Sequence, residues 1–317
     1  MRLKLVYTVF ILFVKLSVTN LQFQPVIAIV AASIPEDSDD PKEAVVYLTY
    51  TKWASDSGAK VIPILPWYSK EKINHILDKV NGVIWQGGMR NLRIGGHFEN
   101  LNKYILEKII NKNDKNTYFP MFLICQGFEL VHILMANNTK ILSDYTAMKY
   151  FIPMEINNNT RSSNMYSKLD EKDFQTFTKS NSTVHYHKYG FEPELYNKYK
   201  IFSDFFNINS FGYDRNGKKF IGSVEAKKYP IYAVQYHPEK VKYDRNIPSN
   251  SIVNSKEAFE MSKKLADFFI EETRKNKQKI TDLELREYSM INPSIEPIFY
   301  HSTWVYLFNK KTKNLKR

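Results

Sequence analysis

The sequence predicts an α/β fold: a single domain with a mostly parallel central sheet flanked by helices. Three observations lead to this prediction. Short apolar segments alternate with segments of helical periodicity through about residue 136, which is typical of parallel strands covered by helices on both faces. The chain has 317 residues, 43% apolar and 15% aromatic, so it can bury a large core. Three groups of chemically active residues each follow a predicted strand.

The first four elements are a strand, a helix, a strand and a helix. Residues 25–31 form a β-branched run bounded by turn residues, which indicates a buried strand. Residues 41–57 begin with proline, carry apolar residues at helical spacing and stop before a glycine, so they predict a helix. A second apolar run predicts a strand at 59–65. A serine at the first position of 69–77 can cap a helix there.

The same alternation continues through the next four elements. Residues 82–85 predict a third strand, which ends just before a pair of glycines. Apolar residues at helical spacing predict a helix over 98–112. The run at 119–124 predicts a fourth strand, and 127–136 predict the helix that follows it. This order requires a parallel sheet.

From about residue 139 the pattern becomes irregular and more strand-like, with loops at 157–165 and 178–183. Further elements are predicted as strands at 184–187, 219–226 and 230–236, and as a long amphipathic helix at 255–275. Neither a linker nor a repeat divides this region. The predicted organisation is a signal peptide at 1–20, one catalytic domain at 21–305 and a basic tail at 306–317.

The first residues have the pattern of a secretory signal peptide. Arg2 and Lys4 precede an apolar run that is too short to span a membrane. The alternative interpretation is a buried first strand. Three glycosylation sequons, at Asn137, Asn158 and Asn181, fit passage through the secretory route. We therefore expect a secreted, extracellular or lysosomal (vacuolar) glycoprotein.

The net charge of +12 and the pI of about 9.3 permit a polyanionic partner. The basic residues are scattered, however, so drift in composition explains the charge more simply, and no basic module predicts binding to nucleic acid. Cys125 is the single cysteine, which excludes an intramolecular disulfide and a cysteine-based zinc site. A lone cysteine in a secreted chain indicates an intermolecular bridge, a reactive thiol or an inert buried residue.

Three motifs lie at the carboxyl ends of predicted strands, where ligands bind in open parallel sheets. They are Gln86-Gly87-Gly88, Cys125-Gln126-Gly127-Phe128-Glu129 and Tyr236-His237-Pro238-Glu239. Each alone also has a purely structural interpretation, as a turn, a buried cysteine or a capped turn. Their common location at one edge of one sheet favours a catalytic site.

The residue types suit acyl transfer on an amide. A cysteine at a strand-to-helix turn is exposed at the sheet edge, and the helix N-terminus is expected to lower its thiol pKa. The backbone N–H groups of Gln126 and Gly88 can face the developing oxyanion. His237 is the expected base and then acid for the leaving amine, and Glu239 can orient its imidazole.

The motifs also resemble a known family. Phe122-Leu-Ile-Cys125-Gln-Gly-Phe-Glu129, together with Ile231-Tyr-Ala-Val-Gln-Tyr-His-Pro-Glu239, resembles the class I glutamine amidotransferase-like superfamily. Within it, the chain is similar to the gamma-glutamyl hydrolases over about residues 25–305. The resemblance implies a flavodoxin-like sheet and the removal of glutamates from folylpoly-γ-glutamates. It also implies no cofactor, a homodimer, and activity in an acidic compartment or after secretion.

The resemblance also implies roles for single residues. Cys125 corresponds to the nucleophile, His237 to its acid–base partner, and His187 to a histidine near the γ-glutamyl group. Gly88 and Gln126 correspond to the oxyanion donors. Next to them, Gly87 and Arg90 are expected to contact the substrate. On charge and position alone, Arg90 and Arg93 are the candidates for binding its α-carboxylate.

Two positions depart from the family pattern. Leu123-Ile124 replace the usual Gly-Thr before the cysteine, and Gln86 replaces the proline before the two glycines. We expect these changes to affect strand–helix packing and the stiffness of the glycine loop. Two other functions remain open: a glutaminase that supplies ammonia to a partner, and a non-catalytic protein of the same fold that binds folate or glutamate.

Overall fold

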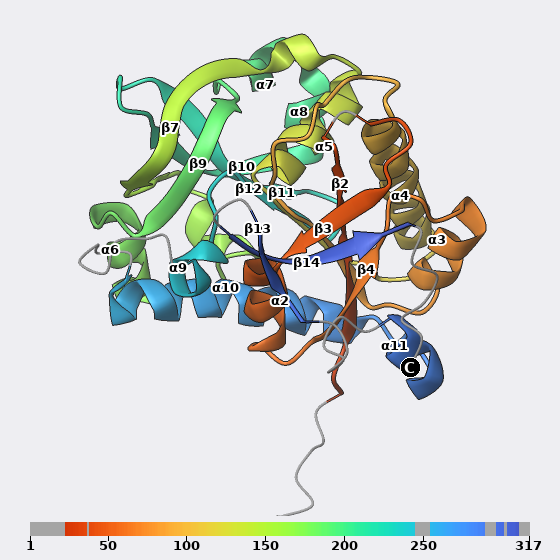
Figure 1. Ribbon diagram of the computed structural model, residues 1–317. Helices are drawn as coiled ribbons and strands as arrows, with labels where there is room; N and C mark the ends of the chain where they lie inside the picture. Colours follow the sequence, from red (N-terminus) through yellow and green to blue (C-terminus); the bar gives the residue numbers. More distant parts are fainter. Residues whose placement is uncertain (1–22, 37, 245–253, 289–295, 301–302, 311–317) are drawn as a thin grey trace, which may run out of the picture.

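The computed structural model describes residues 23–36, 38–244, 254–288, 296–300 and 303–310, and Figure 1 shows their arrangement. The predicted signal peptide, residues 1–20, lies outside these described residues. An eight-stranded sheet runs through the molecule in the order β4-β1-β5-β6-β12-β11-β10-β8. The strands of its first part are parallel, and the mostly parallel α/β fold predicted from the sequence is confirmed.

The parallel part of the sheet contains the predicted N-terminal strands and one late strand. Its members are β4 (Lys60–Ile64), β1 (Val26–Val30), β5 (Gly82–Trp85), β6 (Met121–Ile124) and β12 (Ile231–Val234). They are short, apolar and almost wholly buried, as expected for strands with helices on both faces. β5, β6 and β12 are neighbours, so their carboxyl ends lie side by side.

The irregular second half of the chain extends this sheet with antiparallel strands. These are β11 (Lys219–Ala226), β10 (Phe206–Tyr213) and β8 (Glu155–Ile156). A separate two-stranded sheet pairs β7 (Ser143–Ile152) with β9 (Thr183–Gly190). β9 contains the predicted strand at 184–187, whereas β7 and β10 had no distinct sequence signal.

The helices of the described residues range from four to twenty residues. They are α2 (Leu48–Ser55), α3 (Lys70–Leu77), α4 (His97–Asp114), α5 (Gln126–Ala136), α6 (Glu171–Lys179), α7 (Leu195–Lys198), α8 (Lys200–Phe205), α9 (Lys240–Tyr243), α10 (Lys256–Lys275) and α11 (Asp282–Tyr288). Two single 3₁₀ turns lie at Thr139–Ile141 and Thr160–Ser162. Ser69 caps α3 through the N–H of Lys72, as predicted.

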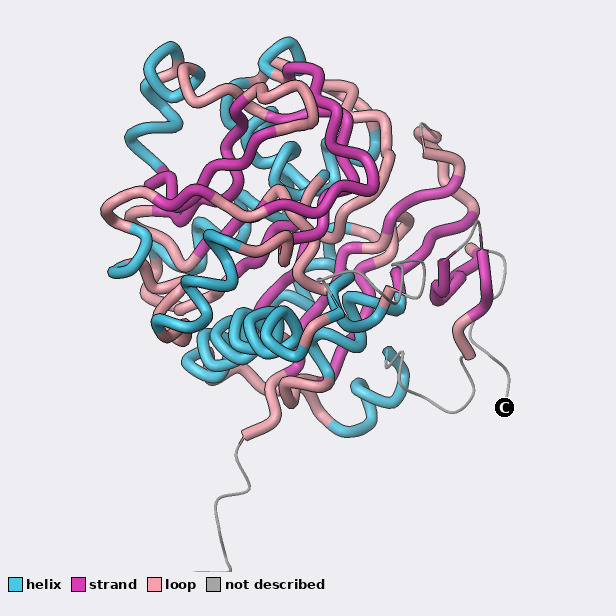
Figure 2. Tube along the Cα trace, turned by 90° about the vertical axis from the view of Figure 1, so that its left-hand side faces the viewer, coloured by secondary structure: helices cyan, strands magenta, loops and turns pink. Residues whose placement is uncertain are grey.

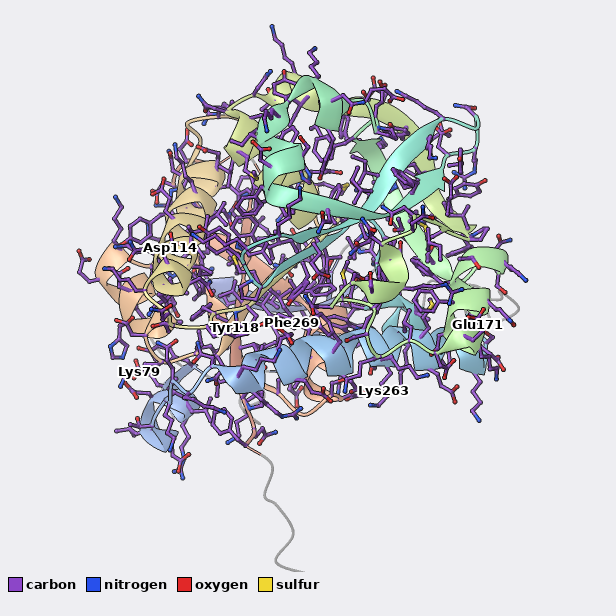
Figure 3. All side chains as sticks on the ribbon, turned by 180° about the vertical axis from the view of Figure 1, so that it is seen from behind. Lys79, Asp114, Tyr118, Glu171, Lys263 and Phe269 are labelled. Carbon is purple, nitrogen blue, oxygen red and sulfur yellow. The ribbon has the colours of Figure 1, made fainter. Side chains whose placement is uncertain are left out.

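Successive side chains along each strand point to opposite faces of the sheet, so the core forms two layers. One face of the sheet packs on α3, α4 and α5, and the other packs on α2 and α10. Leu123 belongs to the first layer and Ile124 to the second. Figure 2 shows α10 nearly end-on beneath the strands. Seen from behind in Figure 3, α10 directs Lys263 outward, while Phe269 is fully buried against the sheet.

One predicted helix is partly wrong. Only the second half of 41–57 is helical, as α2, whereas the first half is the strand β3 (Glu43–Tyr47). Its Ala-Val-Val run forms ladders with β14 (Thr303–Asn309) on one side and β2 (Ala32–Ile34) on the other, and β13 (Ile298–Tyr300) completes this four-stranded sheet. Pairing with distant strands therefore overrides the local helical spacing.

The folded part of the chain continues beyond residue 305. Residues 306–309, assigned to the basic tail from the sequence, belong to β14, where Tyr306 is buried and Phe308 packs on the core. Among the described residues, no helix combines the length and the apolar character needed to cross a membrane.

Candidate active site

The structure brings the three predicted motifs together at the carboxyl ends of β5, β6 and β12. Gly87 and Gly88 follow β5, and Cys125 lies between β6 and α5. His237 follows β12, and its backbone N–H donates to the carbonyl of Val184 on β9 at 2.8 Å. The site thus lies between the carboxyl ends of the parallel strands and the β7–β9 sheet.

Cys125 occupies a sharp turn with a positive φ of 53° and a ψ of −107°. Its N–H donates to the carbonyl of Val234 at 2.8 Å, and its own carbonyl accepts from the N–H of Glu129 at 2.9 Å. A Cβ on Gly127, in the first turn of α5, would lie 2.8 Å from the Trp85 carbonyl oxygen. Glycine is needed there for α5 to approach β5. The backbone of Cys125 costs about 1–3 kcal/mol and is typical of reactive residues.

Gly87 separates the cysteine from the histidine. A Cβ added at Gly87 would lie 3.1 Å from Cys125 Cβ, 2.9 Å from His237 Cε1 and 2.8 Å from the Tyr50 hydroxyl. The side chains of Cys125, His237 and Tyr50 therefore surround the position that a Gly87 side chain would take. A hydrogen atom fits there, but a methyl group does not. Gly87 thus lies between the side chains of Cys125 and His237.

We expect Gly87→Ala to lower kcat by at least about 100-fold, because the new methyl group must push His237 or Cys125 out of position. The measurement is turnover, by correctly folded variant, of the γ-glutamyl substrate that the sequence resemblance implies. Gly88→Ala is the matched control: its Cβ would lie 3.2 Å from Gln126 Oε1, the end of a side chain, so its loss should be much smaller. Equal activity of Gly87→Ala and wild type would contradict this arrangement.

His237 is held by a buried carboxylate. Its Nδ1 lies 2.8 Å from Glu239 Oε1 and 3.4 Å from the Tyr50 hydroxyl, which itself accepts from the Gly87 N–H at 2.7 Å. Glu239 is fully buried. The carboxylate therefore assigns the ring proton to Nδ1. Nε2 is buried and has no hydrogen-bond partner among the described residues, which leaves its lone pair available to accept a proton.

The pKa of the Cys125 thiol moves in the direction opposite to the prediction. Burial raises this pKa well above its ordinary value, and the carboxylates of Glu129 and Glu239 raise it further. The backbone N–H of Gln126 lowers it, as expected for a helix N-terminus, but does not compensate for the burial. Burial thus favours the neutral thiol, and the expected lowering of the thiol pKa is wrong.

Glu129 is a buried carboxyl group beside this thiol. Burial raises its pKa to about 8, although the amide of Gln235 donates to Oε1 at 3.1 Å and opposes the shift. The same Gln235 Nε2 lies 4.0 Å from Cys125 Sγ. Below about pH 8 Glu129 is protonated and uncharged, so it no longer raises the pKa of the Cys125 thiol. The thiol is then easier to ionise than it would be beside a charged Glu129 carboxylate.

The raised pKa of Glu129 makes folding stability pH-dependent. The folded state retains a proton that the unfolded state releases above about pH 4.5, so stability falls as the pH rises from about 4.5 to about 8. Glu129→Gln should remove this fall, which is on the order of 4 kcal/mol. Urea unfolding at pH 5 and pH 8 measures it. Glu107→Gln, at an exposed position of α4, is the control. Parallel pH profiles of wild type and Glu129→Gln would contradict the assignment.

The glycine loop is fastened to the start of α5. The side chain of Gln126 accepts from the backbone N–H of Arg90 at 2.8 Å and donates to the Arg90 carbonyl at 2.7 Å. Arg90 is buried; its guanidinium donates to the carbonyl of Ser33 at 2.8 Å and lies 3.5 Å from the Glu36 carboxylate. The sequence predicted only the backbone N–H of Gln126 as functional, so the role of its side chain was missed.

His187 on β9 ends a chain of hydrogen bonds. The Thr183 hydroxyl donates to the Ile152 carbonyl at 2.6 Å and lies 3.0 Å from His185 Nε2. The other ring nitrogen of His185, Nδ1, lies 3.1 Å from His187 Nε2. His187 Nδ1 in turn lies 2.8 Å from the Tyr189 carbonyl. Carbonyls at both ends only accept, so the four contacts need four protons, while the hydroxyl and two neutral rings hold three. Burial lowers the pKa of His187 to about 4. One contact therefore lacks a proton at neutral pH.

Two cavities meet at Cys125. The larger, about 630 Å³, is lined by Gly88, Arg90, Gln126, Glu129 and His187. The smaller, about 400 Å³, is lined by His237 and Gly87. Cys125, Gly88, Met89, Met148 and Tyr186 contribute to both. All eight predicted site residues except Glu239 thus border a cavity, and Glu239 lies behind His237.

Several functional neighbours were not predicted. Tyr50 contacts both Gly87 and His237, yet it lies in a segment that the sequence presented only as a helix. Glu129 and Gln235 belong to the quoted motifs, so their proximity to Cys125 was an available signal. Among the described residues, no group of three or more His, Cys, Asp or Glu side chains is arranged to hold a metal ion.

The departure at Gln86 has a structural explanation. Its buried amide donates to the carbonyls of Val30 and Val45 at 3.1 and 2.9 Å, and its oxygen accepts from the N–H of Tyr47 at 3.1 Å. The side chain thus joins the glycine loop to β1 and β3, and stiffens the loop through hydrogen bonds. Leu123 and Ile124 are fully buried on opposite faces of β6.

This fold and site define a class. The family described as glutamine amidotransferase class-I matches residues 49–254, and the chain belongs to it. Within that class it belongs to the gamma-glutamyl hydrolases. Gamma-glutamyl hydrolase B of Dictyostelium discoideum is 29% identical over 92% of this chain and 85% of its own length. Gamma-glutamyl hydrolase 1 of Arabidopsis thaliana is 30% identical over 81% and 74%. The PurLQS structure from Thermotoga maritima is 13% identical, with a TM-score of 0.48, and covers 78% of this chain and 99% of that chain.

Proposed function

We propose that this enzyme hydrolyses γ-glutamyl amide bonds, with Cys125 as the nucleophile and His237 as its base and acid. The observation that carries the proposal is the meeting of Cys125, His237 and Tyr50 around Gly87. Membership of the gamma-glutamyl hydrolase family supports the same bond specificity.

The reaction follows from the arrangement of Cys125, His237 and Glu239. As Cys125 Sγ attacks the γ-carbonyl carbon, its proton passes to His237 Nε2, and Glu239 stabilises the resulting imidazolium. The oxyanion faces the N–H groups of Gln126 and Gly88. The C–N bond then breaks as His237 returns the proton to the departing amine, which leaves a thioester. Water attacks the thioester, His237 accepts its proton, and the thiol departs with that proton.

The position of His237 supports an assignment of the two cavities. The departing amine must lie near His237, so the smaller cavity holds the leaving group. The larger cavity, with Gln126, Glu129 and His187, holds the γ-glutamyl group. Glu129 is protonated below about pH 8, so it can donate a hydrogen bond to a substrate carboxylate there.

The proposed substrate is the poly-γ-glutamate chain of folates, without cofactor or nucleic acid. The positive net charge of the chain favours approach of such a polyanion. The acceptor asparagines of the three sequons, Asn137, Asn158 and Asn181, are exposed, which supports a glycoprotein that is secreted or directed to a lysosome or vacuole. The homodimer stays a prediction.

Purified protein tested on three substrates separates the alternatives. We expect release of glutamate from γ-glutamyl-glutamate, little from free glutamine and none from α-linked diglutamate. Preference for glutamine would favour a glutaminase, whereas binding of γ-linked diglutamate without turnover would favour a non-catalytic binding protein. Either result would overturn the proposed function.

A further inference from the structure

A lysine interrupts strand β7 at the edge of the leaving-group cavity. Met148 pairs with Tyr186 and Tyr150 with His185, so Lys149 is an extra residue without a partner on β9. Its φ is +50°, in the left-handed region that glycine and asparagine adopt readily and lysine does not. Such a bulge redirects a side chain out of the regular alternation of the strand.

Other contacts hold this bulge in place. The guanidinium of Arg215 donates to the Lys149 carbonyl at 3.0 Å and stacks 4.4 Å from the Tyr150 ring. A second bond from Arg215 reaches the carbonyl of Thr146 at 3.3 Å. The unfavourable backbone of Lys149 is thus fixed by its surroundings, which is expected where a conformation serves binding.

The ammonium group of Lys149 is available for a ligand. Lys149 lines the smaller cavity together with Cys125 and His237, and no hydrogen bond or ion pair engages its side chain among the described residues. The other cation of this cavity, Lys240, is already paired with Asp244 at 2.9 Å and lies over the Tyr186 ring. Lys149 therefore supplies the uncompensated positive charge on the leaving-group side.

We propose that Lys149 determines leaving-group specificity by binding a carboxylate of the departing glutamate. This inference rests on the proposed function, because it uses the assignment of the smaller cavity to the leaving group. A terminal γ-linked glutamate leaves with two carboxylates close to the new amine, and an exposed ammonium can pair with one of them. An uncharged leaving group gains nothing from Lys149.

Two substrates that share the γ-glutamyl group test the inference: γ-glutamyl-glutamate and γ-glutamyl-p-nitroanilide, whose leaving group has no carboxylate. Lys149→Asn removes the charge with a residue that tolerates the left-handed backbone, so folding should be retained. We expect KM for γ-glutamyl-glutamate to rise about tenfold, or about 1.4 kcal/mol, with kcat changed much less. The kinetic constants for the anilide should change less than twofold, and Lys149→Arg should restore most of the lost affinity.

Lys188→Asn is the matched control, because Lys188 lines the larger cavity and should affect both substrates equally. The inference is overturned if Lys149→Asn leaves KM for γ-glutamyl-glutamate unchanged, or if it weakens both substrates to the same extent. If the wild-type chain cleaves neither substrate, the proposed function fails and the inference fails with it. If wild type cleaves the anilide but Lys149→Asn does not change the preference between the two substrates, only the inference is overturned.

Discussion

Cys125→Ala is expected to reduce hydrolysis by at least about 10⁴-fold, the scale seen when a nucleophile is removed. The substitution deletes one sulfur atom and leaves the strand-to-helix turn, the Gln126 N–H and the His237–Glu239 pair in place. Stability should change by no more than about 2 kcal/mol. Turnover of γ-glutamyl-glutamate and the urea midpoint, measured on the same preparation, separate loss of chemistry from loss of fold.

Two controls make this result specific. Cys125→Ser introduces a hydroxyl of similar size and should be nearly as inactive, because the resting thiol depends on transfer of its proton to His237 and a hydroxyl gives up its proton less readily. Since Cys125 is the single cysteine, iodoacetamide should add one label to wild type and none to either variant. Retention of a few per cent of wild-type turnover by Cys125→Ala would exclude Cys125 as the nucleophile.

His237→Ala is expected to lower kcat by about 10³-fold or more, because it removes both proton transfers. Burial raises the pKa of the thiol and favours its neutral form, so without the imidazole it has no nearby base. Alkylation of Cys125 should therefore slow across the range from pH 5 to pH 8. The measurement is the labelling rate against pH, alongside turnover.

Glu239→Gln supplies the graded comparison. The amide that this substitution introduces can still contact Nδ1, but it cannot stabilise the imidazolium by charge, so we expect a smaller loss than for His237→Ala. Tyr50→Phe removes the hydroxyl that touches Gly87 and His237 and should also cost less. Superimposable alkylation profiles for wild type and His237→Ala would show that His237 does not act as the base for the Cys125 thiol.

The parallel part of the fold and the centre of the site were accessible from the sequence for one physical reason. Short buried strands and amphipathic helices carry local periodicities, and the ends of parallel strands meet at one sheet edge. Cys125, Gly87 and His237 could therefore be placed together without coordinates.

Features that depend on distant contacts could not be predicted. β3 was misassigned because its partners, β2 and β14, are not local to it. The thiol pKa was predicted in the wrong direction because the helix N-terminus is visible in the sequence, whereas the burial of Cys125 and the position of Glu129 are not. The bulge at Lys149 is likewise invisible, since its sequence contains neither glycine nor asparagine to indicate a positive φ.

The pairing of β3 with β14 has a consequence for the biosynthesis of the enzyme. Glu43 and Asn309, which face each other at the end of this ladder, are 266 positions apart. Tyr47 of β3 and Thr303 of β14 both line the leaving-group cavity. On the ribosome, β3 can pair early with β2, but its other edge must stay unpaired until nearly all of the described chain has been translated and β14 has emerged. Cys125 and His237 are thus synthesised before β14, the strand that contributes Thr303 to the wall of this cavity.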